Sequence, residues 1–297
     1  MAVTDRPKFQ TTGIMVHVVI ALLPGLGVSA WFLGPKMLLV VLISILVAVA
    51  TEAIGTRSVL TLRDGSAVVT GMLIGLCLPP SVAIWVPIVA SVSAITLGKL
   101  LFGGLGKNLF NPAMVGYALV LIAFPMQLVY LDGLTGATAL DVLKHHERES
   151  LDQLVNHPAF GLVGSKHFEW MNLAFLVGGL YLVLLRIVPW LIPLSVLLGI
   201  AVPALVFFPL GDAMHSFGSP WFHLFAGGTM LTAFFIATDP VTSPSTKLPQ
   251  IMYGFFVGSV AFFIRCFGTW ADGFAFAILL ANAFLPLLEP KKVALDK

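Results

Sequence analysis

Hydrophobic residues run along most of this 297-residue chain in long blocks, without the alternation of apolar and polar positions that strands show. Five intervals hold no charged residue: 9–35, 65–98, 108–131, 187–211 and 213–238. Each matches or exceeds the roughly 20 residues that a helix needs to cross a bilayer. Once flanking residues are included, four shorter apolar blocks also become spans: 37–51, 170–185, 248–264 and 273–288. The pattern predicts an all-α integral membrane protein, and it argues against a β-barrel.

The blocks divide into ten expected transmembrane helices, near residues 13–33, 36–55, 66–78, 82–102, 110–130, 171–187, 189–210, 221–238, 248–267 and 272–288. Only 10% of the residues are charged, against roughly 25% in a soluble domain. If both termini are cytoplasmic, eleven Lys and Arg residues lie inside and five outside, which satisfies the positive-inside bias. We therefore expect cytoplasmic termini, with the long loop 131–170 on the outer side.

Two pairs of similar segments indicate an internal repeat. "TGMLIGLCLPP" ends at Pro80 and "LTAFFIATDP" ends at Pro240, while "LFGGLGKNLFNPAMVG" and "CFGTWADGFAFAILLAN" follow with an offset of similar size. Units of five helices contain an odd number of spans, so the second must face the opposite way. The prediction is an inverted repeat of residues 1–130 and 171–297, with interrupted third and eighth helices, as in transporters. Alternatively, Gly and Pro recur here only because membrane helices contain many of them.

The loop sequence "LDGLTGATALDVL" is unusually polar for this chain. One interpretation is a helix N-cap, because Thr138 and Asp141 fit the capping-box spacing. The wider stretch from Asp132 to Thr138 resembles the D-x-x-[ST]-G-A-[ST] signature at which a flavin transferase attaches FMN to the last threonine by a phosphoester. The small Gly136 and Ala137 allow close approach to the backbone, and the acceptor must be a hydroxyl.

Three further stretches strengthen that resemblance: "DGSAVVTGMLIGLCLPP", "GGLGKNLFNPAMVGYAL" and "FFIATDPVTSPSTK". They resemble segments of the RnfD/NqrB family, membrane subunits of ion-translocating electron-transport complexes, in the same order and spacing from Arg63 to Pro290. Without a long N-terminal extension, the chain is more similar to the D subunits of Rnf complexes than to the B subunits of sodium-pumping quinone reductases.

The resemblance implies covalent FMN on Thr138, within an attachment motif that includes Asp132, Thr135, Gly136 and Ala137. It also implies a noncovalent flavin such as riboflavin inside the helical bundle, and a fold similar to urea transporters. Rnf complexes couple electron transfer between ferredoxin and NAD to movement of Na⁺ or H⁺. Expected partners are therefore Rnf subunits A, B, C, E and G, the flavin transferase and membrane lipid. No basic-aromatic surface for nucleic acid is present.

Three polar residues of the expected bundle are candidates for binding the second flavin or an ion. Asn108 and Asn111 form an N-x-x-N-P turn, although Asn111 before a proline is also an ordinary helix start. Asp239 follows an interrupted helix, where a carboxylate in apolar surroundings is costly and suggests a role. A solvated turn is the alternative for Asp239.

Other titratable residues are expected to be structural. Glu52 should extend from the second span to the interface, and His17 should be hydrogen-bonded inside the first. The adjacent His145 and His146 diverge unless the backbone bends, so no metal site is expected. Two rival functions remain open: a small-solute channel of the urea-transporter type, and a scaffold for other subunits.

Overall fold

The computed structural model describes residues 11–129, 139–140, 142, 159–210, 217–270 and 272–289. Within these ranges the chain is helical, and the only β-pairing is an isolated antiparallel bridge between Phe160 and Ser165. The expected flavin-attachment residues Asp132, Thr135, Gly136, Ala137 and Thr138, and also His145 and His146, lie outside the described residues.

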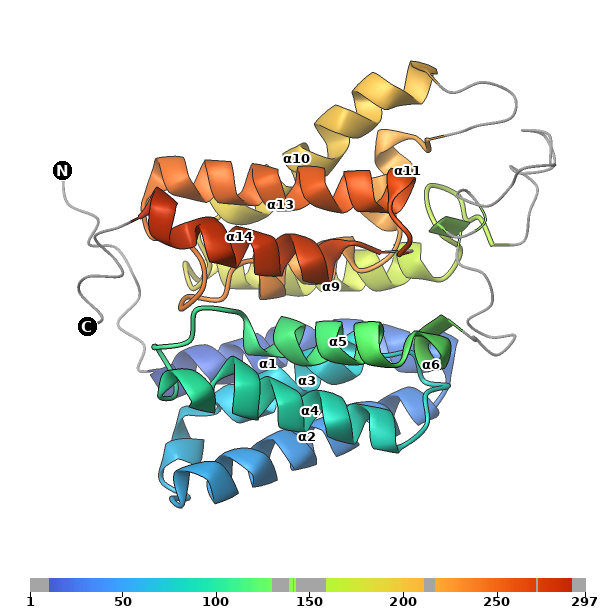
Figure 1. Ribbon diagram of the computed structural model, residues 1–297. Coiled ribbons are helices and arrows are strands. Elements are labelled where there is room, and N and C mark those ends of the chain that lie inside the picture. The colour runs from blue at the N-terminus through green and yellow to red at the C-terminus, as the bar shows by residue number, and fades with distance from the viewer. Residues whose placement is uncertain are drawn as a thin grey trace.

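The helices form two groups, which lie one above the other in Figure 1. The first group contains α1 (Thr11–Leu33), α2 (Lys36–Thr56), α3 (Ser66–Cys77), α4 (Trp85–Gly98), α5 (Pro112–Ala123) and α6 (Pro125–Val129). The second contains α9 (Phe168–Leu184), α10 (Leu191–Phe207), α11 (Pro220–Phe225), α12 (Thr229–Leu231), the π-helix η4 (Thr232–Ile236), α13 (Lys247–Phe267) and α14 (Phe274–Leu288). Short 3₁₀ turns add η1 (Thr61–Asp64), η2 (Leu100–Phe102) and η3 (Phe208–Leu210).

Packing inside the two groups follows a similar order. In the first, α2 packs on α3 and α4, and α4 packs on α5. In the second, α10 packs on α11 and α13, and α13 packs on α14. The groups meet through α1 against α9 and through α5 against α14. Between α1 and α9, the ring nitrogen Nδ1 of His17 lies 2.8 Å from the hydroxyl of Tyr181, which confirms the hydrogen bond expected of this histidine.

Small residues allow the helix backbones to approach closely. A Cβ added to Gly178 of α9 would collide with the carbonyl oxygen of Ala21 in α1. A Cβ added to Gly258 of α13 would collide with the carbonyl oxygen of Val196 in α10. Such contacts are typical of membrane helices, which associate by close packing because lipid offers no hydrophobic driving force between them.

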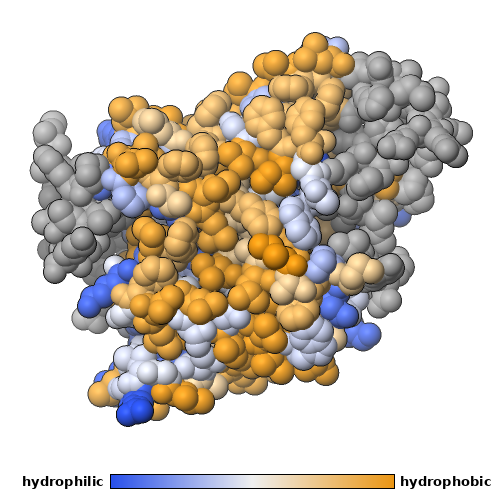
Figure 2. All heavy atoms as spheres, viewed as in Figure 1, coloured by the Kyte–Doolittle hydropathy of each residue, from blue (hydrophilic) through white to orange (hydrophobic). Residues whose placement is uncertain are grey.

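The helices and their surface confirm an all-α, multi-pass membrane protein. In the part of the chain that the structure describes, five helical segments are long and apolar enough to cross a bilayer: Thr11–Leu33, Lys36–Thr56, Trp85–Phe102, Leu191–Leu210 and Lys247–Phe267. Shorter apolar helices are α3, α5, α9 and α14. Large hydrophobic side chains such as Trp31, Ile54 and Leu184 point outward with at least 77% of their surface exposed. Hydrophobic atoms cover most of the visible face, while hydrophilic ones gather toward its two ends (Figure 2).

The segment expected to form the interrupted eighth span is broken into three helical pieces. The chain leaves α11 at Ala226, passes through Gly227 in the left-handed region at φ +57°, and re-enters helix at Thr229. It then continues as the π-helix η4, a rare form that is frequently found at functional sites. The third expected span is α3, a helix of only 12 residues that ends before Pro79.

Candidate functional site

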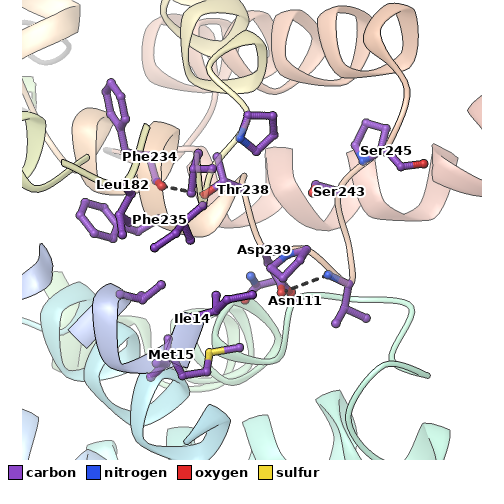
Figure 3. A pocket seen from close by; sticks show the side chains of 18 of the residues that line it. Ile14, Met15, Asn111, Leu182, Phe234, Phe235, Thr238, Asp239, Ser243 and Ser245 are labelled. Atoms are coloured by element: carbon purple, nitrogen blue, oxygen red, sulfur yellow. Dashed lines mark hydrogen bonds between the residues drawn. The ribbon is translucent and has the colours of Figure 1, made fainter. Parts of the chain in front are cut away.

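A large cavity lies where the two helix groups meet. Its volume is about 1130 Å³, and its walls come from both groups. In Figure 3, Phe234 and Phe235 of η4 lie across this space from Ile14 and Met15 of α1. Asn108, Asn111 and Asp239, which the sequence singled out, all line it. The structure therefore brings Asn108 and Asn111 together with Asp239, which lies far from them in the sequence.

Asn111 makes hydrogen bonds through its backbone N–H and through both polar atoms of its side chain. Its side-chain oxygen accepts the backbone N–H of Met114 at 3.2 Å, with Pro112 in the first turn, so its interpretation as a helix cap is confirmed. Its amide nitrogen donates to the carbonyl of Ile236 at 3.3 Å, and its backbone N–H donates to Asn282 at 2.9 Å. Asn111 thus ties α5 to the second helix group rather than presenting a free amide.

Asn108 is different, because one of its polar atoms has no hydrogen-bond partner among the described residues. The side chain is 6% exposed, and its amide nitrogen donates to the carbonyl of Phe110 at 3.1 Å. Its oxygen Oδ1 is buried and unpaired. A buried acceptor without a partner costs free energy, so a ligand N–H group would be stabilising here.

Asp239 organises the turn that follows η4. One carboxylate oxygen accepts the backbone N–H of Val241 at 3.3 Å, and the other accepts the hydroxyl of Thr242 at 2.9 Å. The preceding Thr238 donates its hydroxyl to the carbonyl of Phe234 at 2.6 Å. Asp239 is half-buried and lines the cavity, so it combines the turn-forming role with a position at the candidate site.

Glu52 does not extend to the interface, and that prediction is wrong. It is 2% exposed, and both of its carboxylate oxygens lie 2.7 Å from the amino nitrogen of Lys99. Lys99 lines the cavity and also donates to the hydroxyl of Ser66 at 2.6 Å. The carboxylate stays buried because a paired charge costs far less to bury than a single one. The sequence signal that was missed is a Glu and a Lys of opposite charge inside two of the expected spans, 36–55 and 82–102.

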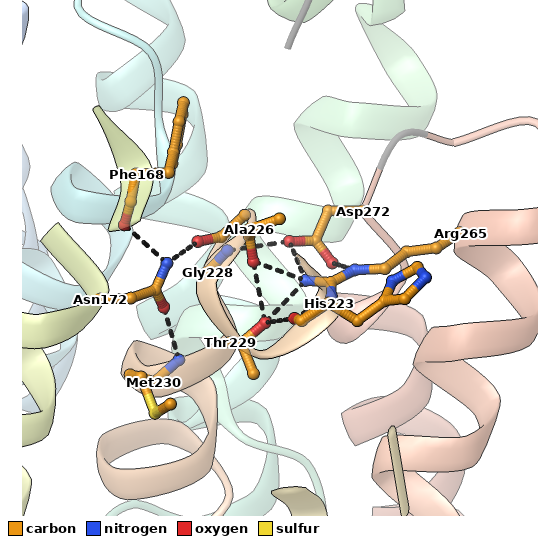
Figure 4. Close-up of polar contacts among 10 residues, drawn as sticks. Phe168, Asn172, His223, Ala226, Gly228, Thr229, Met230, Arg265 and Asp272 are labelled. Atoms are coloured by element: carbon orange, nitrogen blue, oxygen red, sulfur yellow. Dashed lines mark hydrogen bonds and ion pairs between the residues drawn. The ribbon is translucent and has the colours of Figure 1, made fainter. Parts of the chain in front are cut away.

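A second buried cation lies at the start of α12, among contacts drawn in Figure 4. Arg265 of α13 is 3% exposed and pairs with Asp272, with 3.2 Å between Nη2 and Oδ2. It also donates to the carbonyls of His223 and Ala226, at 2.9 and 3.2 Å, and to the hydroxyl of Thr229 at 3.0 Å. In the charge count made from the sequence, Arg265 was one of the five basic residues assigned to the outer side. Its place inside the expected span 248–267 was the signal that it is buried and paired.

The chain next to the expected attachment site packs against this region. Ala139 is fully buried and Leu140 is 5% exposed. Together with Phe222 and Ala226 they form a small hydrophobic cluster separate from the main core. The residue bonded to Thr138 is therefore held close to the Arg265 contacts.

Comparison with known proteins decides the family. A sequence model described as the NQR2, RnfD, RnfE family matches residues 4–293. The chain belongs to this family. It is 41% identical to the D subunit of the ion-translocating oxidoreductase complex of Pseudomonas aeruginosa strain LESB58, over 96% of this chain and 91% of that protein. It is 38% identical to the protein of the same name from Vibrio cholerae strain O395, over 96% and 94%.

The family resemblance inferred from the sequence motifs is thus confirmed. The three stretches that carry it are 64–80, 103–119 and 234–247, and all three contribute to the wall of the cavity. The first forms α3, the second leads into α5, and the third forms the end of η4 and the turn after it. The motifs of the NQR2, RnfD, RnfE family that lie far apart in this sequence converge on one place.

Proposed function

We propose that this chain is the flavin-carrying membrane subunit of an Rnf-type ion-translocating oxidoreductase complex. In this role it passes electrons between the ferredoxin and NAD branches, coupled to movement of Na⁺ or H⁺. The observation that carries the proposal is the convergence of three family motifs on a cavity of about 1130 Å³. A protein of this kind works with the other Rnf subunits, A, B, C, E and G, and not alone.

The first flavin, FMN, is attached to Thr138 by a phosphoester that a flavin transferase forms. The motif supports this with an acceptor hydroxyl, two small residues at Gly136 and Ala137, and the carboxylate of Asp132. Bound flavin supplies the electron-transfer chemistry, while the protein supplies position and electrostatics. The buried Ala139 anchors the chain beside the attachment residue.

The cavity is the proposed place of a second, noncovalent flavin such as riboflavin. The unpaired Oδ1 of Asn108 fits a flavin N–H group, and Phe234 and Phe235 supply apolar wall. A volume of about 1130 Å³ is slightly above the usual range of ligand pockets, roughly 300–1000 Å³, so it has room for a flavin. Asp239 would contribute a carboxylate to the same flavin or to the path of the cation.

The proposed architecture is ten spans in two inverted units, residues 1–130 and 171–297, of the urea-transporter type. Two similar ion pairs support it. Lys99, just after α4, donates to Ser66 at the first residue of α3, and Arg265, near the end of α13, donates to Thr229 at the first residue of α12. Each cation is buried against a carboxylate. In the proposed orientation, the termini are cytoplasmic, and loop 131–170 with its flavin is on the outer face of the bacterial inner membrane.

The test is the fluorescence of the denatured polypeptide under ultraviolet light, after co-expression with a flavin transferase. We expect a fluorescent band in the unmodified chain and in Thr138→Ser, which keeps a hydroxyl, and no band in Thr138→Ala. Mass spectrometry of the peptide containing residue 138 measures the modification directly. An unmodified peptide from the native complex would refute the flavin-carrying role and favour the rival small-solute channel, for which the same cavity would serve as the permeation path.

A scaffold without redox function is separated from the proposed role by a second measurement. Electron transfer in membranes containing the whole complex should be lost in Thr138→Ala if this chain carries electrons. Normal electron transfer with the substituted chain assembled would favour the scaffold.

A further inference from the structure

We propose that Gly227, Asp272 and Arg265 form a seat that fixes Ala139 and Leu140 at the start of α12, and so limits the movement of the group attached to the adjacent Thr138. The inference rests on the proposed function only for the identity of the attached group. The seat itself consists of described residues.

The segment has a specific place on the second helix group. Ala139 and Leu140 are buried although they belong to the long connection between α6 and α9. Their apolar partners are Phe222 of α11 and Ala226, and Val142, Ala159 and Phe160 pack around them. This cluster is separate from the core of the bundle, so it stabilises the position of the connection and not the bundle itself.

Gly227 is the position where the segment, the ion pair and the broken helix come closest. A Cβ added there would lie 3.2 Å from Cδ1 of Leu140 and 2.9 Å from Nη2 of Arg265, and it would collide with Oδ2 of Asp272. Its φ of +57° is also unfavourable for a residue with a side chain. Only glycine allows these three groups to lie around this peptide at once.

The ion pair holds the backbone on which Leu140 rests. Arg265 binds the carbonyl of Ala226, and Asp272 accepts the backbone N–H of Gly228 at 3.0 Å. From the other side, Asn172 of α9 donates to the carbonyl of Gly227 at 2.8 Å. The broken segment is therefore clamped from three directions, which gives the seat a defined geometry.

The seat also fixes a distance. From Thr229 the chain runs through α12 and η4 to Thr238, which lines the cavity. At about 1.5 Å per residue, this helical path is at most about 14 Å long. A segment held at one end of this path has a constant separation from the cavity at the other end. Electron transfer between two carriers depends on that separation, so Arg265 and Asp272 act as positioning residues.

Two adjacent glycines provide the experiment and its matched control. Gly227→Ala introduces the collisions described above, whereas a Cβ on Gly228 would meet nothing closer than 3.9 Å. In the assembled complex, a fluorophore is attached to Thr138→Cys in a chain whose Cys77 and Cys266 are replaced by alanine. We expect its fluorescence anisotropy to fall clearly in Gly227→Ala and to stay unchanged in Gly228→Ala. Equal anisotropy in both variants would overturn the seat.

Two further measurements keep the outcome clear. Leu140→Ala removes the apolar contact without straining the backbone, so it should also lower the anisotropy, and it replaces Gly227→Ala if that variant does not fold. In chains that keep Thr138, the midpoint potential of the covalent flavin should shift in Gly227→Ala, because the flavin moves relative to the ion pair of Arg265 and Asp272, and it should not shift in Gly228→Ala. A dark band for the unmodified chain in the denaturing gel would refute the proposed function, while the fluorophore would still decide on the seat.

Discussion

The backbone N–H of Asn111, at the start of α5, donates to the side-chain oxygen of Asn282 in α14 across 2.9 Å. The amide nitrogen of Asn282 donates in turn to the carbonyl of Thr242 at 2.9 Å and to the hydroxyl of Tyr253 at 3.1 Å. Asn282 is completely buried. One side chain therefore connects the first helix group to α13 and to the turn after Asp239, at the edge of the cavity.

Replacing this asparagine should destabilise the protein strongly. Asn282→Leu keeps a similar volume but leaves the N–H of Asn111 and the carbonyl of Thr242 buried without partners. Each unpaired buried group costs roughly 1–3 kcal/mol. Thermal unfolding in detergent should show a clearly lower midpoint, whereas Leu280→Ala on the exposed side of the same helix should have a small effect. Equal midpoints for Asn282→Leu and the unmodified protein would contradict the cross-linking role.

The ion pair of Glu52 and Lys99 should show strong energetic coupling. Lys99→Met leaves a buried carboxylate without its counter-charge, which typically costs about 3–5 kcal/mol. Combining it with Glu52→Gln removes the uncompensated charge, so the double variant should be more stable than Lys99→Met alone. A double-mutant cycle on unfolding free energies measures the coupling. Simple addition of the two single effects would show that the pair contributes nothing as a pair.

The hydrophobic pattern was sufficient to locate the long helices. The spans expected at 13–33 and 36–55 correspond to α1 at Thr11–Leu33 and α2 at Lys36–Thr56, because apolar runs of this length have few alternatives in a membrane. The break inside the span expected at 221–238 could not be located in the same way. It depends on contacts of Gly227 with side chains that are distant in the sequence.

In the candidate site too, features that depend on neighbouring residues could be predicted from the sequence, and contacts between distant residues could not. The cap formed by Asn111 was predictable because its signal, a following proline, is adjacent in the chain. Its bond to Asn282 joins positions 171 residues apart, and the pairing of Glu52 with Lys99 joins positions 47 apart. A single sequence does not show which distant residues are in contact. A charged or amide side chain inside an apolar block is costly to bury, and this cost is the one sign in the sequence that such a residue has a partner.

Stability should depend on pH through Glu289, which lies just beyond α14. Burial raises the pKa of this carboxyl, but hydrogen bonds from the backbone N–H and hydroxyl groups of Ser245 and Thr246 outweigh it, and the pKa lies below its ordinary value of 4.5. A lowered folded-state pKa means that the carboxylate stabilises the fold above the ordinary value. That contribution is lost as the pH falls through the folded-state pKa.

Glu289→Gln measures this contribution, because it removes the titrating group and keeps the shape. At neutral pH the variant should unfold at a lower temperature than the unmodified protein. The difference should shrink as the pH falls through the lowered folded-state pKa, because the native carboxyl then also becomes neutral. A difference that stays constant over this range would show that the charge of Glu289 is unimportant.

Asn108 should decide how tightly the cavity holds the proposed noncovalent flavin. Its unpaired Oδ1 gains a partner when a ligand N–H binds, and a hydrogen bond of this kind contributes about 0.5–1.5 kcal/mol. Asn108→Leu should therefore weaken flavin binding by roughly 2- to 10-fold. Flavin released by denaturation and counted per chain measures the occupancy. The fluorescence of the denatured band, which reports the flavin proposed on Thr138, should not change.

Ser91 provides the control. It also has a buried unpaired oxygen but does not line the cavity, so Ser91→Ala should retain full flavin occupancy. Equal loss in both variants would trace the effect to general destabilisation, because only the cavity residue can lose a contact with the ligand.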